Sequence, residues 1–348
     1  MILHLFTDTN KVFTVPYMKL IREHDDEKLH VFVVWGKVVP EYPIKDAYFI
    51  NDSKGYFNLL KLIYKADKII LHSLFIPKYL LAISVVPRAI AKAYWVVWGA
   101  DLHFHEHAED NFKYKIYDMY RGNFIRKLRG ICTLVIGDYE LAKKWYGTKS
   151  EYFQAIYKVD GLSYAQSLPI KKRENKIRII VGNSATESNN HFHVFELLEK
   201  FKNEDIEIIC PLSYGNMEYA AKVENMGKKI FGAKFIAIKE FFTSEKYIEL
   251  LNSIDVGIFD NTRQQALGNI YLLLVMQKKI YLNSSSEMWT SLHNTEKLKI
   301  FDVEELKTSF IKDVALIEEN DSNKNRNIVL NKNSDMNIYA TWDVIFKS

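Results

Sequence analysis

The sequence is poor in cysteine, with only Cys132 and Cys210 among its 348 residues. Each lies in an apolar run typical of a buried strand, so a disulfide framework is not expected and a reducing compartment is. Long apolar runs are also missing. The most apolar stretch, residues 74–95, is interrupted by Pro77, Lys78, Pro87 and Arg88, and it falls short of the ~20 clean apolar residues of a spanning helix. The first residues, MILHLFTDTN, have no basic region and predict a strand, not a signal peptide. We therefore expect a soluble or peripheral protein.

An excess of one charge is lacking too, since the net charge is only +4. The positive residues are nevertheless unevenly placed, because residues 111–130 hold six basic residues and one acidic residue. A single basic segment does not fit a protein that coats nucleic acid, and no nucleic-acid partner is expected. The same segment has apolar residues at helical spacing, namely Phe112, Ile116, Met119, Tyr120, Phe124 and Leu128. It fits either an interfacial helix at anionic lipid or a core-facing helix with a solvated basic face.

Short apolar runs alternate with longer amphipathic ones, which predicts an α/β protein with parallel sheets and crossover helices. The polar stretch 158–176 is a plausible linker. We therefore predict a Rossmann-like domain over residues 1–160, a second over residues 161–330, and a C-terminal helix over residues 331–348 that possibly packs back on the first domain. The Asn/Lys-rich stretch from Asp321 is predicted to be a loop before that helix. Ligands are then expected beyond the carboxyl ends of the strands, in the cleft between the domains.

The stretch WGADLHFHEHAED follows a strand-like run, and it admits three interpretations. If the chain stays extended, His103, His105 and His107 share one face and could bind zinc, although no second ligand cluster accompanies them. Asp101 or a histidine could instead act as a general base. The third possibility is a capping aspartate followed by a solvated loop.

Two further stretches carry hydrogen-bonding groups between a strand and a helix. Gly182, Asn183 and Ser184 form the first, where glycine allows close approach and a helix N-terminus favours anions. It matches neither GxGxxG nor a P-loop, so dinucleotide and ATP binding are not indicated, and an ordinary capped turn is the alternative. The second stretch reads DNTRQQALGN and contains Arg263, Gln264, Gln265, Gly268 and Asn269. Arg263 suits a phosphate, the amides suit sugar hydroxyls, and a solvated helix start is the alternative.

Together VVWGADLH, IIVGNSATESNNH and SIDVGIFDNTRQQALGN, in this order and spacing, resemble glycosyltransferase family 56, the TDP-N-acetylfucosamine:lipid II N-acetylfucosaminyltransferase family. The resemblance covers residues 94 to 305. It implies the GT-B fold, two Rossmann-like domains facing across a cleft. The second domain would bind the nucleotide sugar, and the first would bind a polyprenyl-diphosphate-linked glycan at the membrane.

Carried over by position, the resemblance assigns the donor diphosphate and sugar to the two polar stretches, that is Gly182, Asn183, Ser184, Arg263, Gln264, Gln265, Gly268 and Asn269. Asp101 would face the acceptor as a catalytic group, with His103, which stands where the family has a tyrosine. No DxD triplet occurs, so no metal and no cofactor are expected, and Arg263 and a helix N-terminus would stabilise the leaving diphosphate. The basic segment, with Arg121, Arg126, Lys127 and Arg129, would contact anionic lipid and the acceptor.

The resemblance thus implies transfer of a fucose-type sugar such as Fuc4NAc, with TDP favoured as the nucleotide, in bacterial surface polysaccharide synthesis. We expect a cytoplasmic enzyme that is peripheral on the inner face of the plasma membrane. Two alternatives stay open, since a fold does not fix a function. They are a nucleotide-sugar epimerase, which has no need for a basic membrane helix, and a non-catalytic nucleotide- or glycan-binding protein.

Overall fold

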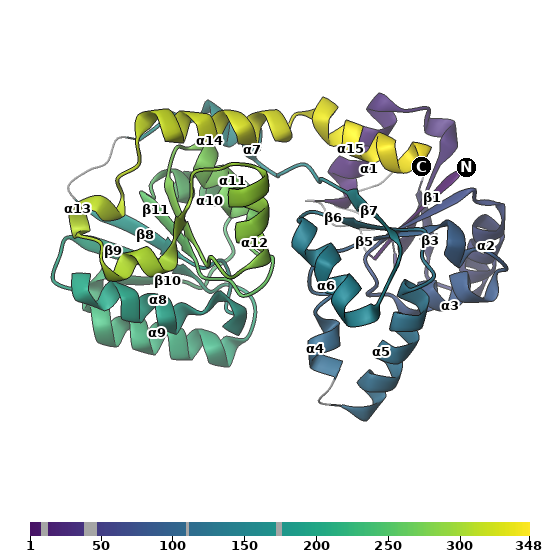
Figure 1. Ribbon diagram of the computed structural model, residues 1–348, viewed down its shortest axis with the longest axis horizontal. Coiled ribbons are helices and arrows are strands. Elements are labelled where there is room, and N and C mark those ends of the chain that lie inside the picture. Colours follow the sequence, from purple (N-terminus) through teal and green to yellow (C-terminus); the bar gives the residue numbers. More distant parts are fainter. Residues whose placement is uncertain (8–12, 38–46, 109–110, 172–175) are drawn as a thin grey trace. The chain divides into compact units, whose positions relative to one another are not determined.

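The structure is a computed structural model that describes residues 1–7, 13–37, 47–108, 111–171 and 176–348 (Figure 1). It divides into two compact units. Unit 1 comprises Met1–Lys158 and Asn333–Ser348, and unit 2 comprises Val159–Lys332. The chain therefore crosses between the units twice. Residues 172–175 of the predicted linker lie outside the described residues.

Unit 1 is built on a seven-stranded parallel sheet in the order β3-β2-β1-β4-β5-β6-β7. The strands are β1 (Ile2–Phe6), β2 (His30–Trp35), β3 (Ala47–Ile50), β4 (Lys68–His72), β5 (Ala93–Val96), β6 (Gly130–Thr133) and β7 (Glu151–Gln154). The helices are α1 (Thr14–His24), α2 (Ser53–Lys65), α3 (Pro77–Val85), α4 (Phe104–Ala108), α5 (Phe112–Ile125), α6 (Ile136–Tyr146) and α15 (Asp335–Lys347). All five residues of β4 are buried, as expected for a parallel strand covered on both faces.

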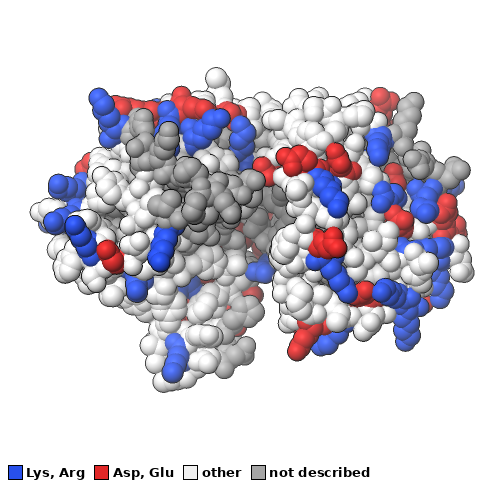
Figure 2. Space-filling view, turned by 180° about the vertical axis from the view of Figure 1, so that it is seen from behind, with Lys and Arg blue, Asp and Glu red and all other residues white. Residues whose placement is uncertain are grey.

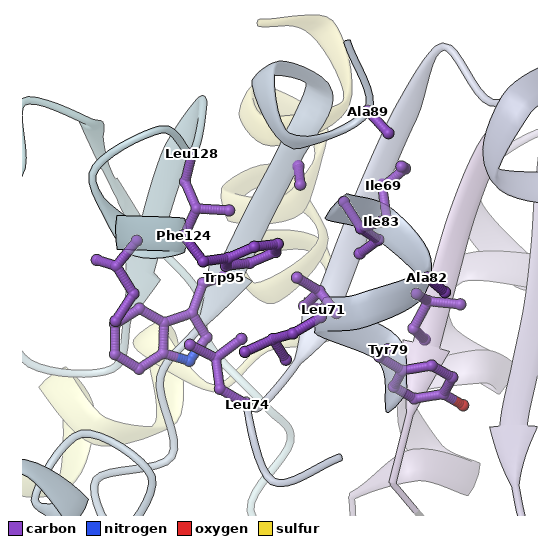
Figure 3. Close-up of a cluster of buried hydrophobic side chains, with 14 of the residues drawn as sticks. Ile69, Leu71, Leu74, Tyr79, Ala82, Ile83, Ala89, Trp95, Phe124 and Leu128 are labelled. Atoms are coloured by element: carbon purple, nitrogen blue, oxygen red, sulfur yellow. The ribbon is translucent and has the colours of Figure 1, made fainter. Parts of the chain in front are cut away.

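Side chains of unit 1 alternate between two cores. One core lies under α2, α3, α5 and α6 and includes Leu71, Trp95 and Phe124, which Figure 3 shows packed together. The other lies under α1 and α15, and Trp342 of α15 is fully buried there. The Trp342 indole also donates to the Ile156 carbonyl at 2.8 Å. The C-terminal helix is thus an integral part of unit 1 (Figure 1).

Unit 2 contains a six-stranded parallel sheet in the order β10-β9-β8-β11-β12-β13, the arrangement of a Rossmann fold. The strands are β8 (Ile177–Val181), β9 (Ile206–Pro211), β10 (Phe235–Ile238), β11 (Val256–Phe259), β12 (Lys279–Leu282) and β13 (Phe301–Asp302). The helices are α7 (Leu162–Ser167), α8 (His191–Leu198), α9 (Met217–Phe231), α10 (Ser244–Asn252), α11 (Leu267–Val275), α12 (Glu287–Trp289), α13 (Ile311–Val314) and α14 (Glu319–Lys332).

The stretch that begins at Asp321 is helical, so the predicted loop is wrong. Helix α14 packs on unit 2 through Val329 and also through polar side chains, which apolar periodicity does not reveal. Asn325 pairs with both the amide and the carbonyl of Lys299, at 2.7 and 2.8 Å. Arg326 donates to the carbonyls of Val275 and Gln166. These bonds tie the helix to the backbone of three other segments.

Candidate active site

Asp101 lies in the loop after β5 and is almost completely buried, with 1% of its surface exposed. Its Oδ2 accepts hydrogen bonds from the Leu74 amide at 2.9 Å and the Trp95 indole at 2.8 Å. Its Oδ1 accepts from the amides of Trp98 at 2.9 Å and Leu102 at 3.1 Å. An ionised carboxylate has about four acceptor positions, so these four donors fill it.

This environment argues for a positioning role of Asp101 over the role of base. Burial raises the pKa of the carboxyl group, while the bonds from Trp95, Leu74 and Trp98 lower it. A base must offer a lone pair to the reacting hydroxyl, and here each lone pair already holds a donor. The carboxylate therefore joins the ends of β4 and β5 and fixes the loop that leads to His103.

His103 has the free lone pair that a general base needs and that Asp101 lacks. Its Nδ1 lies 2.6 Å from Glu106 Oε2, and its Nε2 is buried without a hydrogen-bond partner among the described residues. When Nδ1–H donates to a carboxylate, Nε2 carries the free lone pair of a neutral imidazole. The edge of the ring packs against Trp145, with ring centroids 5.3 Å apart. The pair can therefore accept a proton at Nε2 while Glu106 stabilises the resulting charge.

The histidines do not lie on a strand, so the shared strand face required by the zinc interpretation is wrong. Gly99 takes φ +80°, the chain turns, and Phe104–Ala108 forms α4. His105 points to a different carboxylate from His103, with Nδ1 2.7 Å from Asp118 Oδ2. The side chain of His107 lies outside the described part of the structure. In the part of the chain that is described, no three His, Cys, Asp or Glu side chains are grouped to hold a metal ion.

Arg121 is buried, which corrects its predicted place at a membrane surface. Only 1% of it is exposed, and it donates to the Asp118 carboxylate at 3.2 Å and to the Asp101 carbonyl. Its guanidinium lies 4.8 Å from the centre of the Phe104 ring. Because α5 carries Arg121 and Asp118, this helix supports the Asp101 loop from below.

The other three basic residues assigned to the membrane and acceptor, Arg126, Lys127 and Arg129, are exposed. Arg126 donates to the Tyr146 carbonyl at 3.2 Å, and Arg129 forms an ion pair with Glu151 at 3.3 Å. Lys127 lies beside them at the end of α5. A surface anion would have to compete with the exposed Glu151 for Arg129, and an exposed ion pair of this kind is weak.

In unit 2, Gly182 ends β8 with φ +67°. A Cβ there would lie 2.7 Å from His191 Nε2 and 2.8 Å from Asn189 Oδ1, so the position requires glycine. The turn is then fixed by Asn189, which accepts from the Asn183 amide at 2.9 Å and donates to Ser184 Oγ at 3.1 Å. The side-chain oxygen of Asn183 is buried without a partner among the described residues.

The structure brings the two polar stretches of unit 2 together, as expected for loops that follow neighbouring strands β8 and β11. Ser188 of the first stretch bonds Gln265 of the second at 2.6 Å, and Arg263 Nε donates to Ser188 Oγ at 3.3 Å. Gln264 is half-buried in the same loop. These side chains form one polar surface, although they are 75 to 77 residues apart in the chain.

Asp260, which the sequence analysis did not select, holds this surface in place. It is fully buried and accepts from Asn190 at 2.7 Å, His193 at 2.7 Å and Asn283 at 2.8 Å. These partners follow or lie on three different elements, so one carboxylate joins the loops after β8, β11 and β12. Its position directly after a buried strand is the signal that could have identified it.

The N-terminus of α11 lies in the same loop and is open. Its N-cap is Ala266, at φ +59° and without a side-chain capping bond, so the first amides of the helix need acceptors from elsewhere. A Cβ on Gly268 would meet nothing within 4 Å, which leaves room for a ligand above the first turn. Asn269 is half-buried and donates to the Tyr247 hydroxyl at 2.8 Å. Helix N-termini of this kind favour phosphate oxygens.

A cavity of about 160 Å³ adjoins this helix at the carboxyl ends of β8, β9 and β10. Its walls are largely aromatic, and Asn183 and Asn269 line it as well. The aromatic residues are Tyr214, Phe241, Phe242 and Tyr247. Tyr214 and Phe241 have nearly parallel rings with centroids 6.4 Å apart, and Phe241 is 77% exposed. The sequence analysis missed them, although an exposed aromatic residue just after a strand was the available signal.

Comparison with known proteins decides the family. The family described as 4-alpha-L-fucosyltransferase, glycosyl transferase group 56, matches residues 12–326. The chain belongs to glycosyltransferase family 56. As a member of this family it is a glycosyltransferase.

Solved glycosyltransferases of low identity share the fold of this family 56 enzyme. A glycosyltransferase from Rickettsia africae is 16% identical, with a TM-score of 0.67 over 99% of this chain and 97% of that one. The Escherichia coli trehalose-6-phosphate structure bound with UDP-2-fluoro glucose is 9% identical, with a TM-score of 0.68 over 100% and 98%. A UDP-forming trehalose-phosphate synthase from Burkholderia xenovorans is 6% identical, with a TM-score of 0.65 over 100% and 99%. These enzymes have the GT-B fold, which confirms the predicted fold class.

Proposed function

We propose that this enzyme transfers a fucose-type amino sugar, such as Fuc4NAc, from a TDP donor to a lipid-linked glycan. The observation that carries the donor half is the convergence of two polar loops and the open N-terminus of α11 beside an aromatic cavity. Diphosphate oxygens bind at the amides of α11 and at Arg263. The nucleobase enters the cavity, where Tyr214 and Phe241 offer stacking surfaces and the unpartnered oxygen of Asn183 accepts a hydrogen bond from the base.

The donor class is tested with a thermal-shift panel of TDP-, UDP- and GDP-sugars. We expect TDP-sugars to give the largest rise in Tm, because a ligand stabilises the state that binds it in proportion to its affinity. A larger rise with UDP or GDP would contradict the choice of nucleotide. An assay of the donor without acceptor then separates the alternatives, since an epimerase would convert the free donor and a transferase would wait for the acceptor.

Replacing Arg263 by alanine should weaken TDP-sugar binding by about 1.5–3 kcal/mol, the range for hydrogen bonds to charged groups. Its guanidinium is held over the polar surface by Ser188, so little ordering is needed when the diphosphate binds. Calorimetry with TDP measures the loss. Thr262→Ala is the matched control, because Thr262 is an exposed neighbour in the same loop and is not one of the predicted donor residues. Equal affinities for the parent and Arg263→Ala would remove this residue from the donor site.

For the acceptor half, we propose that His103 removes the proton from the acceptor hydroxyl while Glu106 stabilises the imidazolium. Asp101 and Arg121 position this loop through its backbone. The departing diphosphate develops negative charge, which Arg263 and the amides of α11 stabilise without a metal. No step of this proposed reaction needs a cofactor.

The membrane proposal rests on the outward face of α5. Phe112, Ile116 and Met119 recur at helical spacing on the face opposite the buried residues, and they are 77, 54 and 69% exposed. Helices α4 and α5 project from unit 1 (Figure 1), and in Figure 2 this lobe is mostly uncharged surface. Lys113 and Lys115 flank the apolar stripe. We infer that the stripe inserts shallowly into an anionic bilayer. Among the described residues, no helix has both the length and the apolar character to cross a membrane.

Replacing Phe112, Ile116 and Met119 together by serine should lower binding to anionic vesicles by about tenfold or more, because each loses part of the ~1.5–3 kcal/mol of a buried apolar side chain. Vesicle sedimentation measures the change. Phe57→Ser with Tyr64→Ser on α2 is the matched control, since these two side chains are similarly exposed, at 66 and 73%. Activity on a short water-soluble acceptor should survive. Unchanged sedimentation of the triple variant would exclude α5 as the membrane contact.

A further inference from the structure

A second cavity of unit 2 lies at the amino ends of the strands, whereas the donor loops follow their carboxyl ends. It has a volume of about 350 Å³ and sits where β8, β9, β11 and β12 begin. Its lining is almost entirely charged and polar, consisting of Lys171, Lys176, Arg178, Glu207, Ser253, Asp255 and Lys278. In a parallel sheet all amino ends of the strands lie on one side and all carboxyl ends on the other, so this cavity is distinct from the donor site.

Lys278 is the unusual member of this lining. Only 5% of the residue is exposed, yet its ammonium group has no hydrogen-bond or ion-pair partner within the described part of the chain. Burial lowers its pKa, and the positive charge of Lys171 lowers it further, while Asp255 raises it. Lysine is rarely buried to this extent, and partial desolvation of its charge is costly, to which the like charge of Lys171 adds.

Among the described residues, the cavity has two carboxylates against four cationic side chains, so the carboxylates balance only half of the positive charge. Glu207 Oε2 accepts from Arg178 Nε at 2.7 Å, and Asp255 Oδ2 accepts from the Arg178 amide at 2.9 Å. Lys176 lies 3.9 Å from Glu207, which is a loose contact. Of these described groups, the two carboxylates are directed mainly to Arg178, and the lysines keep an excess of positive charge.

We propose that this cavity binds a phosphate-type oxyanion, either a phosphate monoester or a diphosphate, with Lys278 as its deepest contact. Such an anion supplies several acceptor oxygens and neutralises the lysines that surround it. Lysine acts as a point charge toward phosphate, so the site selects charge and size more than a particular organic group. The proposal is independent of the proposed sugar transfer, since it concerns the amino ends of the strands and not the donor loops at their carboxyl ends.

Titration of inorganic pyrophosphate into the full-length protein tests the proposal, with the donor site first filled with saturating TDP. Calorimetry should show one further equivalent of pyrophosphate bound, with an affinity that falls as salt rises. In Lys278→Met, which keeps the length of the side chain, the affinity should fall by about tenfold or more, the lower end of the effect of a charged hydrogen bond. Lys229→Met, an exposed lysine on α9, should leave it unchanged.

The Tm of Lys278→Met shows whether a loss of pyrophosphate binding is caused by misfolding of the variant. Without the anion, Lys278→Met should melt at or above the temperature of the parent, because a buried unpartnered charge has been removed. Pyrophosphate should then raise the Tm of the parent and not that of the variant. Absence of the additional equivalent, or equal binding by parent and Lys278→Met, would overturn the proposal. Failure of TDP to bind would count only against the proposed donor.

Vesicles distinguish a soluble anion from a lipid headgroup. Phosphatidic acid carries a phosphate monoester, whereas phosphatidylglycerol carries the same kind of anionic surface with a less accessible phosphodiester. If the natural ligand is a lipid headgroup, Lys278→Met should lose binding to phosphatidic acid vesicles and keep binding to phosphatidylglycerol vesicles. If the ligand is a soluble phosphate, the variant should bind both kinds of vesicle like the parent and differ only with pyrophosphate.

Discussion

Replacement of His103 by alanine should lower the turnover number by about 10²- to 10⁴-fold, the usual contribution of general acid–base catalysis, while donor affinity stays the same. The expectation follows from the geometry of the imidazole, whose Nδ1 faces Glu106 at 2.6 Å and whose Nε2 has no partner among the described residues. Deleting the ring removes the acceptor of the proton and leaves the donor loops of unit 2 untouched. Steady-state kinetics with calorimetry for TDP measure the two effects separately.

His105→Ala is the matched control for this experiment. His105 lies two residues away and is also paired with a carboxylate, Asp118, at 2.7 Å. If both variants lost activity equally, the role of His103 would be structural. Asp101→Asn should lower the activity for another reason, because the amide NH2 group would replace an oxygen that accepts two hydrogen bonds, and its two N–H groups would face two buried donors. We expect it to lower the Tm as well as the activity, since breaking a buried charged network is strongly destabilising.

Acidification should destabilise unit 1 as the pH falls below about 6.5, the usual pKa of histidine. His4 and His72 are buried in the core between the sheet, α1 and α15, and burial holds the pKa of each well below its usual value. Both are neutral in the folded state, but in the unfolded chain they take up protons below about pH 6.5. Stability therefore falls as the pH falls, by about 1.4 kcal/mol per pH unit for each histidine.

Hydrogen exchange at a series of pH values tests this prediction, because it reports the amides of β1 and β4 separately from those of β8. In unit 2, burial lowers the pKa of His191 to about 4, so one buried histidine acts there and stability should depend less steeply on pH than in unit 1. The variant His4→Leu with His72→Leu should reduce the slope in unit 1, whatever its effect on stability at pH 7. An unchanged slope would assign the acid sensitivity to other groups.

The central strands of both sheets could be predicted from the sequence because they are buried on both faces and read as continuous apolar runs. ILHLF, KIILHS and DVGIFD correspond to β1, β4 and β11. Strands β3, β7 and β13 do not stand out in the sequence in this way, and they lie at the sheet edges. There one side of the strand faces polar surroundings, and a run such as EYFQ carries no distinctive pattern.

The candidate site was predictable where it depends on residues close in sequence. Gly182 and Gly268 were selected because glycine permits close approach, and the structure leaves open space at Gly268. The positioning role of Asp101 could not be predicted from the sequence, since its hydrogen-bond donors come from Leu74 and Trp95 as well as from its own loop. The burial of Arg121 was equally hidden, because its partners become visible only when α5 has packed under that loop.

One core of unit 1 can be completed only after helix α15 has been synthesised. The sheet of unit 1 is synthesised first, but Trp342 and Ile345, which complete one of its cores, follow all of unit 2 in the chain. At a synthesis rate of roughly 5–20 residues per second, the core between the sheet and α1 stays uncovered for roughly ten to forty seconds. During that interval the nascent chain presents an apolar surface to other proteins, so unit 1 depends on the ribosome, a chaperone or unit 2 to shield it until α15 emerges.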